Sequence, residues 1–304
     1  MMSVAVTGAT GFVGPHLIAA LARRGWKLRL LIRRWTPLPS LAGVEAEMVL
    51  GDLGDEAALS QLVDGADAVI HAAGLIKARR PADFHRVNAE GTARLLVKAG
   101  DRPFVLLSSL AAREPALSPY AASKCAAEAA VAGKAIAIRA PAVYGPGDRE
   151  TLTYFKAVAR GLAPQPNLPG ARLSLIHVAD LAEALALAVE TPPPPGVYEI
   201  DDGHAEGYGY ADMAAAAGAA LGRTPRALAL PRSVMAGVAS LNGMLQMLGG
   251  PVQILTAGKV AELFHPDWEI HDRRLAATLG FVPRFDLASG FRQTIAGYRQ
   301  ANWL

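Results

Sequence analysis

The chain has little cysteine, few aromatic residues and little charge. Cys125 is the one cysteine among 304 residues, so an intramolecular disulfide cannot form, as is usual in a reducing compartment. Aromatic residues make up 6% of the chain, charged residues 19% and hydrophobic residues 52%, a balance that excludes a disordered chain. No cationic stretch precedes an apolar run before Val4-Ala5-Val6. We therefore expect no signal peptide and a cytoplasmic protein.

Long uninterrupted apolar runs are also absent. The stretches 181–189 and 234–255 are broken by polar residues and glycines, so we expect buried helices and no membrane span. The net charge is +3, and the basic residues are scattered rather than gathered in one stripe. This pattern argues against a nucleic-acid interface. A small-molecule substrate is the expected partner, and we predict no metal site.

The first half alternates between strand-like and helix-like segments. Helical periodicity covers 12–24, 55–63, 83–99 and 119–132. Alternation of this kind predicts parallel βαβ units, and strands without polar alternation predict a sheet covered on both faces. We therefore expect an α/β protein with a doubly wound parallel Rossmann sheet. The predicted strands are 4–7, 28–32, 47–50, 68–71, 104–108 and 135–139.

Proline and glycine become frequent after Gly145, and four prolines follow one another at 192–195. Beyond them the pattern is mostly helical, with one strand expected at 197–200. We predict a Rossmann domain over 1–182, joined by some later elements, and a small, mostly helical substrate cap over 183–304. Apolar residues of this cap could line an adaptable pocket or simply fill its core. They are Leu228, Leu230, Val234, Met235, Val238, Leu241, Met244, Leu245, Met247 and Leu248.

Three glycines follow the first predicted strand at intervals of three and open the first helix. Gly8, Gly11 and Gly14 lack side chains, so backbone N–H groups can approach a pyrophosphate. The helix N-terminus adds partial positive charge at the same place. Strand, loop and helix together predict a dinucleotide site.

The segment Thr7-Gly8-Ala9-Thr10-Gly11-Phe12-Val13-Gly14 resembles the glycine motif of extended short-chain dehydrogenases/reductases, the epimerase/dehydratase-like enzymes. In that family an Asp after the third strand binds the adenine amino group, and small residues after the fourth let the chain pass the cofactor. The resemblance implies a cofactor site that includes Gly8, Thr10, Gly11, Phe12, Val13, Gly14, Asp52, Leu53, Ala72, Ala73, Gly74, Asn88, Leu107, Ser108, Pro141, Ala142 and Val143. His71, which ends the fourth strand among alanines, is expected to have a packing or cofactor-side role rather than to act as a base.

The end of the second predicted strand bears on the choice of cofactor. NAD sites usually place an acidic residue there for the ribose 2′-hydroxyl. Here Arg33 and Arg34 follow the strand, and the next acidic residue is Glu45. A guanidinium matches a 2′-phosphate in charge and in geometry. The sequence therefore favours NADP over NAD, with Arg33 and Arg34 as additional contacts.

A tyrosine and a lysine four residues apart suggest catalysis. Tyr120 and Lys124 share one face of the predicted helix, where an ammonium would stabilise a phenolate and lower its pKa. In the related family these two residues and a serine at the end of the fifth strand form the catalytic set. The resemblance assigns that serine to Ser109, and gives Lys124 and Tyr120 contacts with the cofactor as well.

Several positions depart from subgroups of the family. Leu110, Ala111 and Ala112 replace the acidic pair that dehydratases carry, and Ala142 replaces an asparagine of many sugar epimerases. The expected activity is therefore NADP-dependent hydride transfer on an apolar ketone or alcohol. A nucleotide-sugar epimerase and a non-catalytic, cofactor-binding structural or sensor protein remain alternatives. A homodimer formed through the helix of Tyr120 is possible, and Asp180 is expected to cap the following helix, with His177 structural beside it.

Overall fold

The structure is a computed structural model that describes residues 1–304. The chain divides into two compact units, each built from separate segments. The first unit comprises 1–140, 181–200 and 272–281, and the second comprises 141–180, 201–271 and 282–304. Residues 141–180, which were expected in the Rossmann domain, lie in the second unit. After Asp180 the chain returns to the first unit twice, at 181–200 and at 272–281.

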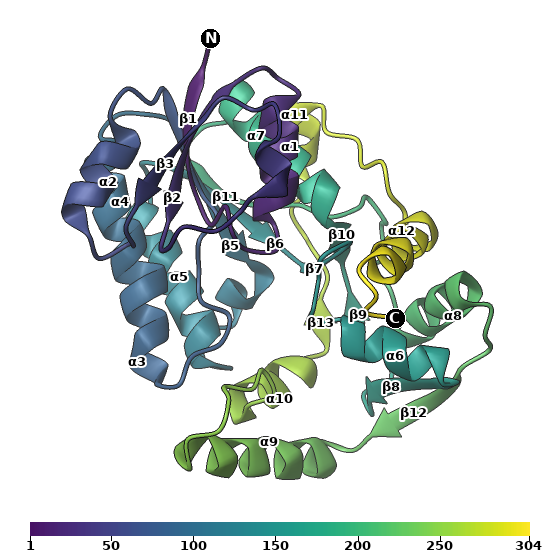
Figure 1. The fold of residues 1–304 in the computed structure, drawn as a ribbon. Helices are drawn as coiled ribbons and strands as arrows, with labels where there is room; N and C mark the ends of the chain where they lie inside the picture. The colour runs from purple at the N-terminus through teal and green to yellow at the C-terminus, as the bar shows by residue number, and fades with distance from the viewer. The chain divides into compact units, whose positions relative to one another are not determined.

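The first unit contains a seven-stranded sheet in which every strand pair is parallel (Figure 1). The strand order is β11-β6-β5-β4-β1-β2-β3, so the chain reverses direction across the sheet between β1 and β4. In open α/β sheets, ligands bind beyond the carboxyl ends of the strands at such a reversal. The predicted doubly wound Rossmann sheet is confirmed.

The elements of the first unit agree closely with the predicted segments. The strand β4 has the predicted bounds, and most others differ by one residue. In chain order the elements are β1 (Ser3–Thr7), α1 (Gly14–Ala22), β2 (Lys27–Ile32), η1 (Pro39–Leu41), β3 (Ala46–Leu50), α2 (Glu56–Val63), β4 (Ala68–His71), α3 (Pro81–Phe84), η2 (His85–Glu90), α4 (Gly91–Ala99), β5 (Phe104–Ser109), η3 (Leu110–Arg113), α5 (Pro119–Val131), β6 (Ile136–Ala140), α7 (Val178–Glu190), β11 (Gly196–Glu199) and α11 (Arg274–Leu279).

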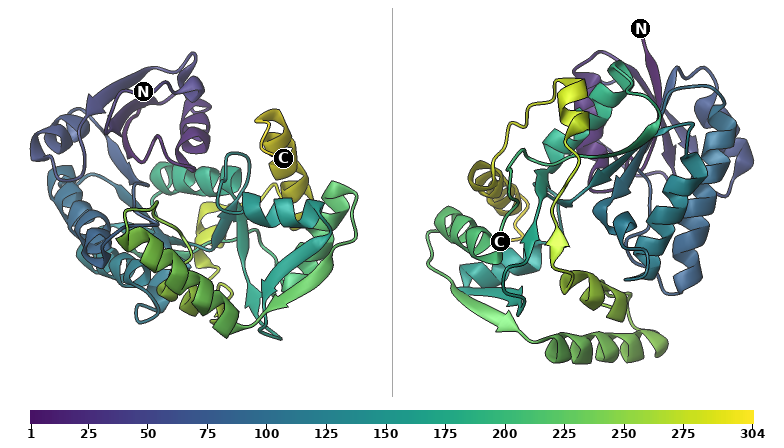
Figure 2. Two further views of the ribbon diagram at one scale, coloured as in Figure 1. Left: turned by 60° about the horizontal axis from the view of Figure 1, so that its bottom comes forward. Right: turned by 180° about the vertical axis from the view of Figure 1, so that it is seen from behind.

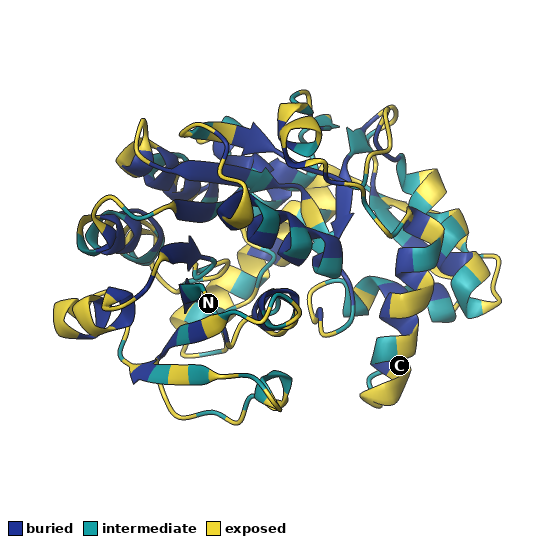
Figure 3. Cartoon of the chain, turned by 90° about the horizontal axis from the view of Figure 1, so that it is seen from above, coloured by how far each residue is buried: buried dark blue, intermediate teal, exposed yellow.

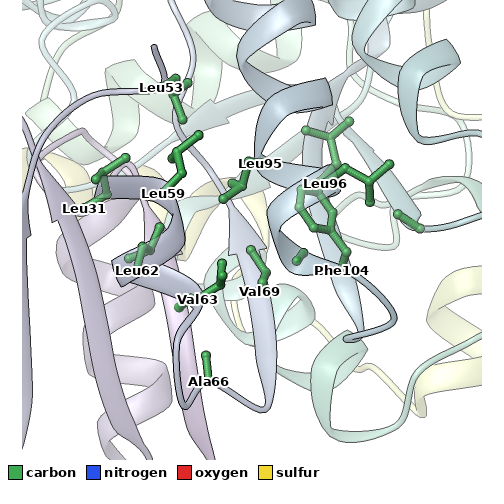
Figure 4. Packing of buried hydrophobic residues seen from close by; sticks show 14 of the residues in the cluster. Leu31, Leu53, Leu59, Leu62, Val63, Ala66, Val69, Leu95, Leu96 and Phe104 are labelled. Atoms are coloured by element: carbon green, nitrogen blue, oxygen red, sulfur yellow. The ribbon is translucent and has the colours of Figure 1, made fainter. Parts of the chain in front are cut away.

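Helices cover both faces of this sheet (Figure 2). On one face, α2, α4 and α5 pack on alternate strand residues such as Val69, Phe104 and Leu106, which form one apolar cluster (Figure 4). On the other face, α1 lies beside α7, and Arg24 at the end of α1 pairs with Glu183 and Glu190 of α7. The central strands are almost wholly buried, while the outer helix faces are exposed (Figure 3). Burial on both faces explains the strands' continuous apolar sequences.

The second unit combines helices with three pairs of short parallel strands. The pairs are β7 with β10, β8 with β12 and β9 with β13. Its elements are β7 (Ala142–Tyr144), α6 (Leu152–Ala159), β8 (Leu162–Pro166), β9 (Arg172–Leu173), β10 (Leu175–His177), α8 (Tyr210–Leu221), β12 (Arg226–Leu230), α9 (Arg232–Met247), α10 (Ala257–Leu263), β13 (Asp267–Trp268) and α12 (Leu287–Gln300).

The core of the second unit is aromatic. Phe155 and Phe291 meet edge to face with ring centroids 5.0 Å apart, and Tyr144 and Tyr298 continue the row at 5.1 and 5.6 Å. A Cβ on Gly290 would lie 2.2 Å from the Tyr144 hydroxyl, so α12 needs glycine there to approach the ring. The few aromatic residues of the chain thus concentrate where short strands provide little apolar surface.

Two details of the expected C-terminal cap are wrong. The strands β12 and β13 were not expected, because their pairing partners β8 and β9 lie far away in the sequence. Core filling was also the leading interpretation of the apolar residues of α9, yet Val234, Leu241 and Leu245 are half exposed or more. The structure contains no helix that is long and apolar enough to cross a membrane.

Candidate active site

The glycine loop joins β1 to α1 at the carboxyl end of the sheet. Gly8 has φ +82°, and a Cβ on it would lie 2.7 Å from the backbone of Ala72. A Cβ on Gly14 would lie 2.1 Å from the Ala9 carbonyl oxygen. These two positions admit no larger residue, so backbone and the start of α1 surround a cradle suited to phosphate groups.

A pocket of about 490 Å³ lies beside this loop and is lined by Thr10, Arg33, Arg34 and Thr36. Both arginines are exposed and follow the last residue of β2. The first acidic residue after β2, Glu45, lies at the opposite edge of the sheet, where it pairs with Lys27 at 2.5 Å. The loop after β2 therefore offers two guanidinium groups to this pocket and no carboxylate.

Asp52 and Leu53 follow β3 at the same edge. The Asp52 carboxylate accepts a hydrogen bond from the Gly54 N–H at 2.7 Å, so the turn fixes its direction while it stays exposed. Leu53 is buried under α4, where a Cβ on Gly91 would lie 2.9 Å from its Cβ. Leu53 is thus a packing residue whose backbone lies beside the expected adenine site.

His71, the last residue of β4, is buried between two threonines. Thr7 Oγ1 lies 2.6 Å from Nδ1, and Thr92 Oγ1 lies 3.0 Å from Nε2. Thr92 donates its own proton to the Asn88 carbonyl, so Nε2 must donate to Thr92 and Nδ1 must accept from Thr7. Burial, together with a smaller effect of the nearby Lys124 charge, lowers the His71 pKa to about 3. His71 is therefore a neutral structural group, as expected.

Asn88 lies in η2, a π-helical turn between α3 and α4. Its Oδ1 accepts from the Leu75 N–H at 2.7 Å, and its Nδ2 donates to the Leu75 carbonyl at 3.0 Å and to Ser123 Oγ at 2.9 Å. Ser123 in turn donates to the Tyr120 carbonyl at 2.7 Å. Asn88 thus connects the loop after β4 to the first turn of α5.

Tyr120 and Lys124 lie on α5, whose first turn is fixed by Pro119 and by Ser118 Oγ, which accepts from the Ala121 N–H. The Tyr120 ring is partly exposed and meets Phe84 edge to face at 6.1 Å. Helical spacing places Lys124 one turn further along the same face.

The Lys124 ammonium is buried. Its Nζ donates to the Leu107 carbonyl at 2.7 Å, and a Cβ on Gly74 would lie only 4.0 Å from it. Burial lowers the Lys124 pKa to about 8, and the carboxylate of Glu128 opposes that shift. The fold thus brings Lys124 to Leu107 and Gly74, two residues of the expected cofactor site.

The two serines that end β5 point to opposite faces of the sheet. The Ser109 hydroxyl is partly exposed and accepts from the Ala111 N–H at 3.2 Å, which starts η3. Ser108 is buried and donates to Glu128 at 2.6 Å. Its side chain is therefore engaged within the protein, whereas the Ser109 hydroxyl can still donate its proton.

Glu128 was not singled out in the sequence, although it lies one turn after Lys124. Its carboxylate also accepts two hydrogen bonds from Arg139, at 2.9 and 2.7 Å. Arg139 lies 3.8 Å from the buried Glu199. The spacing of Lys124 and Glu128 on one helical face was the one signal in the sequence that could have pointed to Glu128. Its ion pair with Arg139 of β6 could not be read from the sequence.

The second unit holds the remaining expected site residues. Pro141, Ala142 and Val143 lie at its start, in and just before β7. The expected helix cap at Asp180 is wrong, because α7 already begins at Val178. The Asp180 carboxylate instead accepts from the backbone N–H groups of residues 284 and 285, both at 3.0 Å. Asp180 thus has a tertiary rather than a local structural role, and His177 is buried against the rings of Tyr144 and Phe285.

A seven-stranded parallel sheet with this glycine loop defines a Rossmann-type nucleotide-binding protein. The model of the NAD dependent epimerase/dehydratase family matches residues 4–201. The chain belongs to this family, as the glycine motif and the Tyr120–Lys124 pair indicated.

Relatives and solved structures agree with this assignment. The chain is 42% identical over 310 aligned residues to a ceramide reductase of Caulobacter vibrioides, covering 99% of this chain and 96% of the relative. It is 30% identical to a ketoreductase of Stigmatella aurantiaca that is named for a farnesyl-dihydroquinoline oxide, covering 66% and 69%. The crystal structure of gox2253 has the same fold, with a TM-score of 0.79, 23% identity and coverage of 100% and 99%. The chain is therefore an oxidoreductase that uses a nicotinamide cofactor.

Proposed function

We propose that the protein reduces a ketone on a long-chain amide lipid of the ceramide type, with NADPH as the hydride donor. The observation that carries this proposal is the Tyr120–Lys124 pair on α5, with the buried ammonium bonded to the Leu107 carbonyl. The substrate class rests on the 42% identity, over nearly the whole chain, to a protein named ceramide reductase.

The residues of the first unit fit a bound dinucleotide. Gly8 and Gly14 leave room that a side chain would fill, at the N-terminus of α1. Arg33 and Arg34 supply two unpaired guanidinium groups where the adenosine 2′-phosphate of NADP would lie. Asp52 would meet the adenine amino group, and Lys124 the nicotinamide ribose. When bound, the cofactor supplies the hydride that adds to the carbonyl carbon.

The chain's own residues would handle the proton. Tyr120 donates its hydroxyl proton to the ketone oxygen, which becomes the alcohol, while Ser109 donates a hydrogen bond to the same oxygen. The Lys124 ammonium stabilises the phenolate that remains on Tyr120. Asn88 and Ser123 position the first turn of α5 and so the tyrosine.

The test is a spectrophotometric assay of NADPH oxidation with a keto-ceramide in detergent micelles. We expect substrate-dependent loss of NADPH absorbance and one alcohol product per NADPH by mass spectrometry. The Tyr120→Phe variant should lose about 100-fold or more in kcat, in line with general acid–base catalysis. Tyr154→Phe is the matched control, because Tyr154 is a partly buried tyrosine of the second unit. Near-normal turnover by Tyr120→Phe would refute the assignment, and product formation without net NADPH oxidation would indicate an epimerase.

The preference for NADPH can be tested separately by fluorescence titration. Replacement of Arg33 by serine should weaken NADPH binding about 10-fold or more and leave NADH binding nearly unchanged, because only NADPH carries the 2′-phosphate. Arg160→Ser, another exposed arginine, serves as the control. Tighter binding of NADH than of NADPH by the unmodified protein would overturn the NADP assignment.

A further inference from the structure

The helix α9 has its apolar side turned outward. Val234, Val238, Leu241 and Leu245 are spaced four, three and four residues apart, so they form one stripe along the helix. Their exposed fractions are 51, 46, 57 and 50%. Met244, Met247 and Leu248 extend this exposed surface at the end of the helix.

The side of α9 that faces its own unit lies about 100° around the helix from this stripe and is more polar. Met235, Ala239, Asn242 and Gln246 follow the same spacing and are partly or fully buried. Asn242 donates to the Leu255 carbonyl at 3.1 Å in the segment that leads to α10, which lies beside α9 (Figure 2). A surface helix of a globular protein normally turns its apolar stripe inward. The reversed arrangement on α9 indicates that something apolar covers the outer stripe.

The charged residues of the segment that contains this stripe all have one sign. Residues 213–261 contain no aspartate or glutamate, and their four charged residues are Arg223, Arg226, Arg232 and Lys259. Lys259 pairs with Glu262 just beyond the segment, whereas the three arginines are exposed and form no ion pair. An apolar stripe in a segment whose unpaired charges are all cationic complements an anionic lipid surface.

A second copy of the chain fits this surface less well. Two copies that met through α9 would bring Arg232 and its neighbours towards the same cations of the partner, with no carboxylate in 213–261 to pair with them. Like charges placed together oppose association.

We propose that α9 lies in the surface of an anionic phospholipid bilayer, with its outer stripe among the acyl chains and the three arginines at the headgroups. A helix in this position rests on the membrane without crossing it. If the proposed function holds, the protein takes its lipid substrate from the same bilayer. The proposal that α9 binds the membrane does not depend on that function.

Vesicle flotation of the full chain with NADPH tests the proposal. Vesicles of phosphatidylcholine with a quarter phosphatidylglycerol should carry the protein upward at low salt, and pure phosphatidylcholine should carry much less. Each cation near an anionic surface contributes about fivefold to binding, so replacement of the three arginines should lower the partition coefficient on the order of 100-fold. The variant is Arg223→Gln, Arg226→Gln and Arg232→Gln, and its matched control is Lys134→Gln, Arg292→Gln and Arg299→Gln, which changes three exposed cations elsewhere.

The apolar stripe is tested by Val238→Ser, Leu241→Ser and Leu245→Ser together. This variant should lose vesicle binding while its thermal unfolding stays unchanged, because all three side chains are exposed. Its control changes three apolar residues elsewhere that are similarly or more exposed, by Ile76→Ser, Val97→Ser and Val282→Ser. Flotation that is absent in the unmodified protein, or unaffected by the α9 changes, would overturn the proposal. So would a dimer in light scattering that the α9 changes convert to a monomer.

A kinetic comparison separates this proposal from the proposed function. The α9 variant should keep its kcat on a water-soluble, short-chain keto-amide and lose turnover of keto-ceramide in anionic vesicles. If the unmodified protein floats with vesicles but reduces neither substrate, the proposed function fails and membrane binding stands. If it reduces both substrates without floating, membrane binding fails and the proposed function stands.

Discussion

The buried ammonium of Lys124 makes stability depend on pH in a specific way. Burial lowers its pKa from 10.5 to about 8. Between these values the unfolded chain binds a proton that the folded chain has released, so this group makes stability rise with pH from 8 to 10.5. Below pH 8 the lysine is charged in both states, and the buried charge then destabilises the folded state to its full extent. Over the interval from pH 8 to 10.5, at about 1.4 kcal/mol per pH unit, this destabilisation is about 3 kcal/mol.

The comparison of the unmodified protein with Lys124→Met isolates this contribution. Urea unfolding without cofactor should be followed by circular dichroism at several values between pH 7 and 10.5. The free energy of unfolding of the variant, minus that of the unmodified protein, should fall by about 3 kcal/mol across this range. Loss of the hydrogen bond to Leu107 adds a constant and does not alter the slope. Lys134→Met is the control, because Lys134 is exposed and should give a flat difference. If the difference in free energy of unfolding for Lys124→Met does not change with pH, the inference that burial lowers the Lys124 pKa is refuted.

Three further predictions concern the same unit. Gly14→Ala should lower NADPH affinity at least 10-fold in a fluorescence titration, because the new Cβ would lie 2.1 Å from a backbone carbonyl oxygen of the loop. Gly237→Ala is the control and should bind NADPH normally, because a Cβ there has no neighbouring atom within 4 Å. Glu128→Gln should lower the free energy of unfolding by about 3 kcal/mol, since the partly buried Arg139 loses its charged partner. Glu47→Gln, on an exposed pair, should change it by less than about 1 kcal/mol in the same urea unfolding. His71 has a pKa of about 3 in the folded protein, so between pH 6 and 4 only the unfolded chain binds a proton there. The free energy of unfolding should therefore fall as the pH is lowered, by about 1.4 kcal/mol per pH unit more than it does in His71→Gln. An equal acid response of the two proteins would contradict the buried, neutral imidazole.

The first unit could be predicted because its signals are local. Apolar runs of strand length alternate with segments of helical period, and β4 has the predicted bounds of 68–71. The second unit gave weaker signals. The strand β8 contains Pro164 and Pro166, and it pairs with β12 more than 60 residues later. Pairing of short strands far apart in the sequence depends on tertiary contacts, which no local pattern reveals.

The helix α9 shows a second limit. Its apolar residues were visible in the sequence, where a pocket lining and core filling were both considered. The sequence alone does not show which way these side chains point. The structure turns Val238, Leu241 and Leu245 outward and buries Ala239 on the inner side, where Asn242 is partly buried.

Residue spacing in the sequence was enough to predict the kind of site that this chain carries. The glycine spacing specifies a close approach of backbone to phosphate, and the interval from Tyr120 to Lys124 specifies one helical face. The burial and the hydrogen bonds of these groups depend on contacts between segments that are distant in the chain. Such contacts bury the Lys124 ammonium against the Leu107 carbonyl, and they bring Asn88 to Ser123 of α5. Burial and hydrogen-bond partners arise from such meetings, and they set the pKa values on which the proposed proton transfer depends.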